Sequence, residues 1–296
     1  MDEQRPGRPR TSVTDDNVIR IEGMIHEDRR IQLINRIIAE DLKMSLGAVH
    51  QIVHNQLGYS KVSSHWVPKM LTDNHKATRM GLSLFHLMRY QEQGDQFLQR
   101  LVTGDETWVY HFTPESKRAS MTWKHTSSPH PKKFKATLST NKILATVFWD
   151  HDGVLLVDFL SKGETVNATR YCETLVRLRD AIRHKRPGLL RQGVVLLHDN
   201  ARPHTASSTR KLLQRFKWEV LEHPPYSPDL APSDYHLFGP LKKHLAGKRY
   251  ATVDQVHQAV MSWLRDLDSD FFRAGIFALV YRWNKCLDKY GDYVEK

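Results

Sequence analysis

A β-type run that ends at a carboxylate limits the folds open to this chain. Residues 194–197 are Val-Val-Leu-Leu and are followed by His198 and Asp199, which indicates a buried strand. Asp105 lies within another β-type run at 101–112, and Asp234 follows a Pro-rich turn and precedes an apolar helical pattern. Burying three carboxylates close together is prohibitive unless cations neutralise them. The sequence therefore predicts a divalent-metal site with the oxygen ligands that suit magnesium or manganese.

The composition is that of an ordinary globular protein. The chain has 296 residues, of which 40% are hydrophobic and 26% charged, enough for one catalytic domain and a smaller one. Its apolar runs are too short to span a membrane. Cys172 and Cys286 form no C-x-x-C pair, so we expect neither a disulfide framework nor a cysteine zinc site.

The net charge of +11 is concentrated in the middle of the chain. Residues 101–220 hold 20 Lys and Arg against 11 Asp and Glu, whereas residues 1–100 hold 14 against 12 and residues 221–296 hold 10 against 10. A carboxylate site repels a phosphodiester, and basic residues around the site overcome that repulsion. A basic surface with no nucleic-acid role is the alternative explanation.

Residues 1–65 are expected to form a DNA-binding unit that begins with a basic arm. The arm contains Gly-Arg-Pro-Arg at 7–10, which resembles the core of an AT-hook, so Arg8 and Arg10 are candidates for minor-groove contacts. A disordered basic tail is the alternative for these four residues.

Three short helices after this arm suggest a helix-turn-helix. The sequence predicts helices at 15–26, 31–41 and 46–54, with Thr14 and Ser45 as N-caps of the first and third. The major-groove side of the third helix would carry Ser45, Gly47, Ala48, His50 and Gln51. A three-helix packing unit that does not bind nucleic acid is the alternative.

The rest of the chain is expected to form a helical linker at 66–98 and an α/β domain at 99–296. The linker helix, at 73–90, carries an apolar face of Met80, Leu84, Leu87 and Met88 that docks on the catalytic domain or on a second subunit. In the domain, we expect strands at 100–112, 119–123, 143–149, 154–159, 194–198 and 218–222, and helices at 167–184, 206–216, 234–246 and 253–266.

This order of elements is that of an RNase H-like, retroviral-integrase-like fold. The first and fourth core strands of that fold are neighbours, which would bring Asp105 and Asp199 together across 93 intervening residues. The start of the later helix would then add Asp234. Residues 113–141 are too long and basic for a simple hairpin turn and are expected to be an insertion.

Four motifs resemble those of the mariner family of transposases. They are TGDETW at 103–108, HDNARPHTA at 198–206, YSPDLAPSDYHLF at 226–238 and WVPKML at 66–71, and 34 residues separate Asp199 from Asp234 as in that family. The resemblance implies a catalytic triad of Asp105, Asp199 and Asp234 that binds two divalent metal ions, Mg²⁺ or Mn²⁺, with Asp105 bridging both. It also implies cleavage of DNA at transposon ends and strand transfer into target DNA at TA.

The resemblance implies partners as well. These are double-stranded DNA with terminal inverted repeats, TA target sites and a second copy of the chain, in the nucleus and without a membrane. In related transposases the insertion contacts DNA and the partner subunit, so Lys132 and Lys133 are expected to contact DNA. Full-length relatives carry another helix-turn-helix before the GRPR segment, so we expect this chain to lack that first reader and to select transposon ends poorly.

Several alternatives remain open. Asp229 is five residues before Asp234, and only the family pattern selects Asp234. Glu106 is expected on the opposite face of its strand from Asp105, Asp150 and Asp152 in a hairpin turn, and His204 in a structural role at a helix start. The alternative functions are a host-adopted or inactive DNA-binding protein derived from a transposase, and a metal-dependent nuclease that does not join ends.

Overall fold

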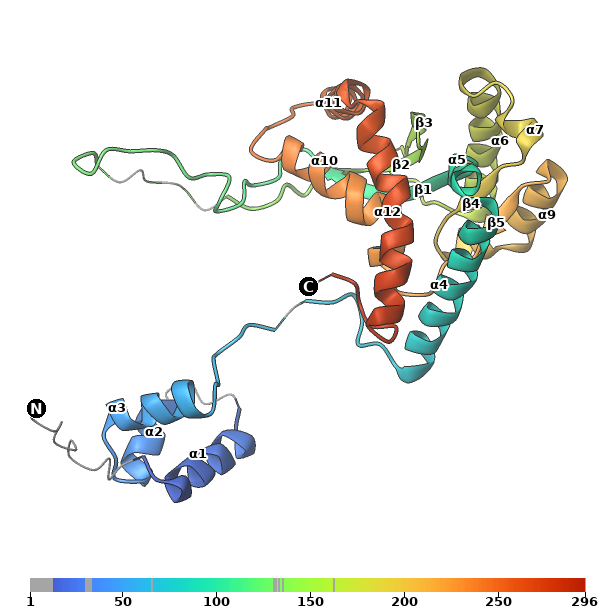
Figure 1. Ribbon diagram of the computed structural model, residues 1–296. Coiled ribbons are helices and arrows are strands. Elements are labelled where there is room, and N and C mark those ends of the chain that lie inside the picture. The colour runs from blue at the N-terminus through green and yellow to red at the C-terminus, as the bar shows by residue number, and fades with distance from the viewer. Residues whose placement is uncertain are drawn as a thin grey trace, which may run out of the picture. The chain divides into compact units, whose positions relative to one another are not determined.

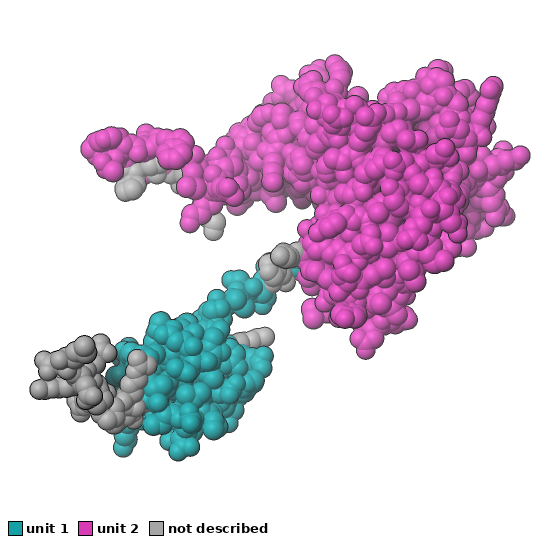
Figure 2. Space-filling view, viewed as in Figure 1, with its two compact units in different colours: residues 1–66 teal, residues 67–296 magenta. Residues whose placement is uncertain are grey.

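The chain divides into two compact units, Met1–Trp66 and Val67–Lys296 (Figure 2). The computed structural model describes residues 13–29, 34–64, 66–129, 132, 134, 136–161 and 163–295. Three of the expected DNA contacts, Arg8, Arg10 and Lys133, lie outside the described residues. Each unit has a hydrophobic core of its own.

The first unit contains three short helices around an aliphatic core. They are α1 (Asp15–Glu27), α2 (Ile34–Asp41) and α3 (Leu46–Gln51), and α3 continues into a π-helical turn at Ile52–Gln56. Both expected N-caps are confirmed, because the hydroxyls of Thr14 and Ser45 accept hydrogen bonds from backbone N–H groups in the first turns of α1 and α3. The helices bury Ile21, Ile25, Ile38, Ala39, Val49, Ile52 and Val53.

The second unit is built on a mixed five-stranded sheet of order β3-β2-β1-β4-β5 (Figure 1). Its strands are β1 (Leu101–Tyr110), β2 (Lys142–Asp150), β3 (Gly153–Phe159), β4 (Val195–Leu197) and β5 (Glu219–Leu221). The first three strands are antiparallel, and β4 and β5 run parallel to β1. The predicted pairing of the first and fourth strands is confirmed, and the order is that of an RNase H-like domain.

Helices cover both faces of the sheet. On one face, α6 (Ala168–Lys185), α7 (Leu189–Gln192) and α9 (Ser207–Phe216) pack against side chains such as Val102 and Phe148. On the other, α10 (Phe238–Leu245), α11 (Val253–Asp266) and α12 (Ser269–Asp288) pack against Leu101 and Val147. Because side chains of a strand alternate between faces, the central strand β1 contributes to both cores.

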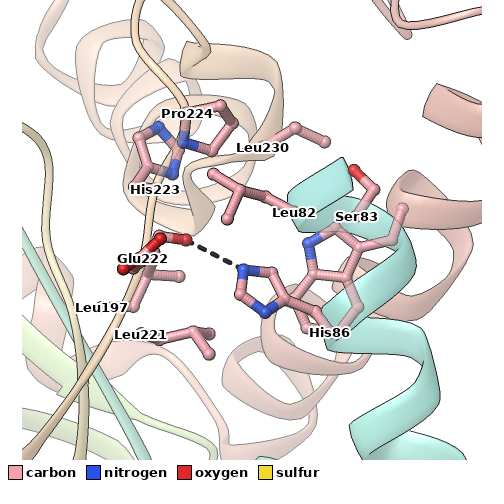
Figure 3. Close-up of a pocket in the computed structure, with 10 residues that line it drawn as sticks. Leu82, Ser83, His86, Leu197, Leu221, Glu222, His223, Pro224 and Leu230 are labelled. Carbon is pink, nitrogen blue, oxygen red and sulfur yellow. Dashed lines mark hydrogen bonds between the residues drawn. The ribbon is translucent and has the colours of Figure 1, made fainter. Parts of the chain in front are cut away.

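The linker helix α4 (Asp73–Gln93) packs on α12 through a largely polar face and leads through α5 (Asp95–Gln99) into β1. The expected apolar face is wrong in part, because Leu84 and Met88 are 50% and 53% exposed. The buried residues are Arg79, Ser83, His86 and Leu87. Figure 3 shows His86 reaching from α4 toward residues 221–224, where its Nε2 donates to the carbonyl oxygen of Glu222 at 2.9 Å.

One other expectation was wrong. Residues 119–123, all of them described, form no strand, since Trp123 is fully exposed and no neighbouring strand pairs with them. The helix expected at 234–246 is present, and it begins as a π-helical turn at Ser233–Leu237 that continues into α10. None of the helices in the described part of the chain has the length and apolar character that crossing a bilayer requires.

Candidate active site

The register of the central strands places Asp105 and Asp199 at the same level. In the parallel pair of β1 and β4, Thr103 lies opposite Leu197. Asp105 and Asp199 each follow two residues later, so continuing the register puts them opposite one another. Neighbouring strands are about 4.8 Å apart, and residues two apart on a strand share a face. Two carboxylates with 93 residues between them in the sequence therefore meet at one edge of the sheet.

Asp234 joins them from the segment that precedes α10. It lies in the π-helical turn Ser233–Leu237, which follows a 3-10 turn at Pro228–Leu230. The indole Nε1 of Trp149 donates to Ser233 Oγ at 3.0 Å and ties the start of this turn to β2. Asp105, Asp199 and Asp234 line one open cleft of about 550 Å³, together with residues that include Glu106, Asn200, His223 and Tyr226.

The backbone of β1 is shaped for this site at Gly104. A Cβ atom at this position would lie 2.2 Å from the ring of Phe148, far inside van der Waals contact. The chain therefore requires glycine directly before Asp105 so that β1 can pass Phe148, which is buried against α6. This close approach is the physical reason for glycine in the TGDETW segment.

The three carboxylates have different surroundings, which shift their pKa values in different directions. Burial, and then the negative charges of Asp234 and Glu106, raise the pKa of Asp105 well above its usual value. Burial and the charge of Asp199 raise the pKa of Asp234, while Lys242 and a hydrogen bond with Asp105 oppose the rise. Burial also acts to raise the pKa of Asp199, but hydrogen bonds from His204 and from the backbone N–H of Ala201 outweigh it and lower that pKa.

This crowding of partly buried negative charge is what a divalent cation would relieve. The donors are carboxylate oxygens, which suit Mg²⁺ and Mn²⁺. Among the described residues, no three His, Cys, Asp or Glu side chains stand in the arrangement of a complete metal site. An ion held here would therefore complete its coordination with water and with oxygens of a substrate.

His204 links two carboxylates of the cleft in a way that the sequence did not show. Its Nδ1 lies 2.6 Å from Asp199 Oδ1, and its Nε2 lies 3.5 Å from Glu106 Oε1. Its ring is buried against Tyr171, with centroids 4.0 Å apart. Burial lowers the pKa of His204, but Asp199 and Glu106 outweigh burial and raise it to about 9. Glu106, expected on the far face of β1, thus lines the cleft and reaches the site through His204.

Two of the neighbouring aspartates are held in buried ion pairs. Both oxygens of Asp229 accept hydrogen bonds from Arg79, at 2.8 and 2.7 Å. Asp150 is fully buried and accepts hydrogen bonds from Arg186 at 2.7 and 2.8 Å. The hairpin turn therefore explains Asp150 only in part, since the ion pair accounts for its burial. These aspartates have their oxygens engaged by arginine, unlike the three in the cleft.

The expected DNA contacts lie on accessible surface where they are described. Ser45, Gly47 and His50 are exposed at α3, and Gln51 is half-buried. Lys132 is exposed within the insertion between β1 and β2. Accessibility permits contact with DNA at these residues and by itself assigns none.

Comparison with known proteins agrees with this geometry. Residues 113–192 match the family model described as "Transposase (partial DDE domain)". The chain is 34% identical to the Mariner Mos1 transposase of Drosophila mauritiana, over 100% of this chain and 83% of that protein. The chain belongs to the mariner family of transposases.

Other relatives and solved structures support this mariner membership. The chain is 35% identical to the human histone-lysine N-methyltransferase SETMAR, over 99% of this chain and 41% of that protein. The structure of the Mos1 transposase paired-end complex with left transposon end matches with a TM-score of 0.81, at 34% identity over 99% of this chain and 83% of that one. The Mos1 mariner paired end complex with Mn matches with a TM-score of 0.82, at the same identity and coverage.

Proposed function

We propose that this chain cuts DNA at the ends of a mariner-type transposon and transfers the cut strands into target DNA at TA. Asp105, Asp199 and Asp234 are the catalytic residues and hold two ions of Mg²⁺ or Mn²⁺. The observation that carries the proposal is the β1–β4 register, which sets Asp105 and Asp199 side by side in the cleft that Asp234 also lines. Structures of the Mos1 relative have been solved with Mn and with Mg and as a strand transfer complex.

The chemistry consists of two displacements at phosphorus. In the first, a water oxygen bonds to phosphorus as the bond to the leaving DNA oxygen breaks. In the second, the oxygen of a freed 3′-hydroxyl bonds to a target phosphorus as a P–O bond of the target strand breaks and the target oxygen leaves as a hydroxyl. When bound, two metal ions activate the attacking oxygen, reduce the charge on the phosphate and stabilise the leaving oxygen.

Side chains of the cleft orient the groups that take part in these two displacements. Asp105, Asp199 and Asp234 line the cleft together and would hold the ions through their carboxylate oxygens. The hydrogen bond from His204 keeps the carboxylate of Asp199 in a fixed orientation and leaves its second oxygen for a ligand.

The domain assignment and the partners form part of the same proposal. Residues 1–65 bind DNA, 66–98 form the linker and 99–296 the catalytic domain with its basic insertion at 113–141. The protein acts in the nucleus as a homodimer on the inverted repeats. We assign DNA contacts to Ser45, Gly47, His50, Gln51 and Lys132, and to Arg8, Arg10 and Lys133 outside the described residues.

A nicking assay on duplex DNA that carries the element's own ends tests this function. Asp199→Asn should abolish strand cleavage with Mg²⁺ or Mn²⁺ and leave binding of the same duplex intact. Cleavage by this variant at the rate of the unmodified chain would reject the metal site. An unmodified chain that binds without cutting would indicate a DNA-binding regulator, and cutting without joining would indicate a nuclease.

A further inference from the structure

Arg79 of the linker helix is completely buried. It has no exposed surface, and its guanidinium reaches two different segments of the second unit. Nη1 and Nη2 donate to the two oxygens of Asp229 at 2.8 and 2.7 Å, Nη1 also donates to Ser227 Oγ at 2.6 Å, and Nε donates to the carbonyl oxygen of Gly291 at 2.8 Å. A paired arginine and carboxylate in this fork geometry fix position and angle together.

Stability alone is a weak explanation for this pair. Removing two charges from water costs several kcal/mol for each ion, and a buried pair is often no more stable than apolar side chains of the same volume. What the pair does supply is a fixed geometry for the segment that carries Asp229. Two further contacts hold this segment: the backbone N–H of Val294 donates to Asp229 Oδ2, and Arg282 donates to the Asp229 carbonyl, each at 2.8 Å.

The position of Asp229 is transmitted to Asp234 through a stiff stretch of chain. Residues 224–234 contain four prolines, which restrict φ at those positions, and one of them, Pro232, lies between Asp229 and Asp234. Two hydrogen-bonded turns hold the backbone of this stretch. The N–H of Leu230 donates to the Ser227 carbonyl, and the N–H of Asp234 donates to the Ala231 carbonyl, both at 3.0 Å. Beyond Asp234, Tyr235 donates to the carbonyl of Gly275 at 2.7 Å. Asp234 therefore sits between an anchor at Asp229 and an anchor at Tyr235.

We propose that Arg79 and Asp229 are positioning residues for the third carboxylate of the cleft, and that their ion pair sets Asp234 at the correct distance from Asp105 and Asp199. This inference rests on the proposed role of Asp234 as a metal ligand. The linker helix and the C-terminal segment meet at Arg79. Through this contact they help to position the metal site, although neither of them contacts the metal or the DNA. Groups that orient a metal ligand typically contribute 10–100-fold to metal affinity.

A second buried aspartate in the same unit, which also pairs with an arginine, provides a matched control. Asp150 and Arg186 form the same two-hydrogen-bond contact, and Asp150 is also fully buried. Asp150 lies three residues along β2 from Val147, the partner of Asp105, which is about 10 Å at the rise of a strand. Asp229→Asn and Asp150→Asn thus each remove the charge of a buried aspartate that pairs with an arginine, and only the first loosens the segment that carries Asp234.

The experiment measures Mn²⁺ binding to the full chain without DNA, by electron paramagnetic resonance titration of free Mn²⁺. All variants are measured below their thermal unfolding midpoints. We expect Asp229→Asn and Arg79→Lys to raise the Mn²⁺ concentration for half-saturation by about tenfold or more. Asp150→Asn should lower the unfolding midpoint to a similar extent and leave Mn²⁺ binding within about twofold, because its effect is on stability alone.

Mn²⁺ binding by Asp229→Asn that equals that of Asp150→Asn would overturn the inference. Asp234→Asn distinguishes this result from failure of the metal site itself, since unchanged Mn²⁺ binding in that variant would reject the proposed ligand. If the charge variants do not fold, Ser227→Ala removes one hydrogen bond of Arg79 without changing the net charge. It should weaken Mn²⁺ binding by a smaller factor, and binding equal to that of the unmodified chain would equally overturn the inference.

Discussion

Asp105 and Asp229 are both aspartates with little access to solvent, yet their surroundings give them different properties. Asp229 is neutralised by the guanidinium of Arg79. Burial raises the pKa of Asp105, and the charges of Asp234 and Glu106 raise it further. A carboxylate with a cationic partner is structurally complete, whereas one with only anionic neighbours is prepared for a metal ion. The charge of the neighbouring side chains, and not the residue type, therefore separates the structural role of Asp229 from the role of Asp105 in the cleft.

Gly104→Ala should destabilise the second unit, because the new Cβ would meet the ring of Phe148 at 2.2 Å. Overpacking of this kind costs roughly 1–3 kcal/mol, and more where the backbone must move. Urea denaturation measures the loss. Adding Phe148→Leu should recover part of it by clearing the ring, and a double variant as unstable as Gly104→Ala would show that the ring is not the cause.

His86 should make the second unit sensitive to mild acid. Burial lowers its pKa, with Arg89 adding to the decrease and the hydrogen bond to Glu222 opposing it. Because the unfolded chain binds the proton at higher pH than the folded one, stability is lost as pH falls below the unfolded value of about 6.5. His86→Gln should lose less stability than the unmodified chain between pH 7 and pH 5, measured by urea denaturation. Equal losses would show that His86 does not contribute.

The linker helix shows how an element can be placed by polar contacts and expose its apolar side chains. Arg79, Ser83 and His86 face α12 and the C-terminal segment, while Leu84, Phe85 and Met88 lie in solvent. Helical periodicity assigns the apolar stripe to the interior, because burial of apolar surface is the usual driving force. Here the hydrogen-bond partners of the polar stripe come from residues more than 130 positions away.

Leu87→Ala and Leu84→Ala test this orientation of α4. Leu87 is 8% exposed and Leu84 is 50% exposed. Leu87→Ala should destabilise the second unit by about 2–5 kcal/mol, since it removes buried methyl groups and leaves a cavity. Leu84→Ala should change the free energy of unfolding by no more than about 0.5 kcal/mol. Similar losses for the two variants in thermal unfolding would mean that the helix is turned differently about its axis.

At the scale of the whole molecule, charge is distributed unevenly relative to the site. The carboxylate cleft lies in the second unit, and residues 101–220 carry most of the net charge of +11. Such an excess attracts the DNA backbone to a site whose own charge repels it. The N-terminal residues of the first unit add Arg8 and Arg10 as a further basic segment.

Duplex DNA binding by the full chain should weaken steeply with salt. Each phosphate contact contributes about 0.9 to the slope of log affinity against log salt concentration. Replacing Arg8 and Arg10 together by Ala should therefore reduce that slope by up to about 2, because two cations that release counterions are lost. Fluorescence anisotropy across a potassium chloride series measures it. An unchanged slope would show that the arm does not contact DNA.

The sequence alone was sufficient for the features that depend on local pattern. Strand order, the helix caps at Thr14 and Ser45 and the motif spacing indicated an RNase H-like domain, because strands and caps leave short, regular signatures. The same patterns brought Asp105 and Asp199 forward as candidates, because a carboxylate within or directly after a buried strand is costly without a partner, whereas the family pattern selected Asp234 over Asp229.

Only the tertiary structure decided the contacts between segments far apart in the chain. The Glu106–His204–Asp199 link requires β1 and α8 (Arg202–Thr205) to meet. The Arg79–Asp229 pair requires the linker helix to pack beside residues 224–234. The helix α12 had no assigned role in the sequence, yet it forms the surface on which α4 packs. Each of these depends on which partner a side chain meets after folding, and hydrophobic periodicity carries no information about polar partners distant in sequence.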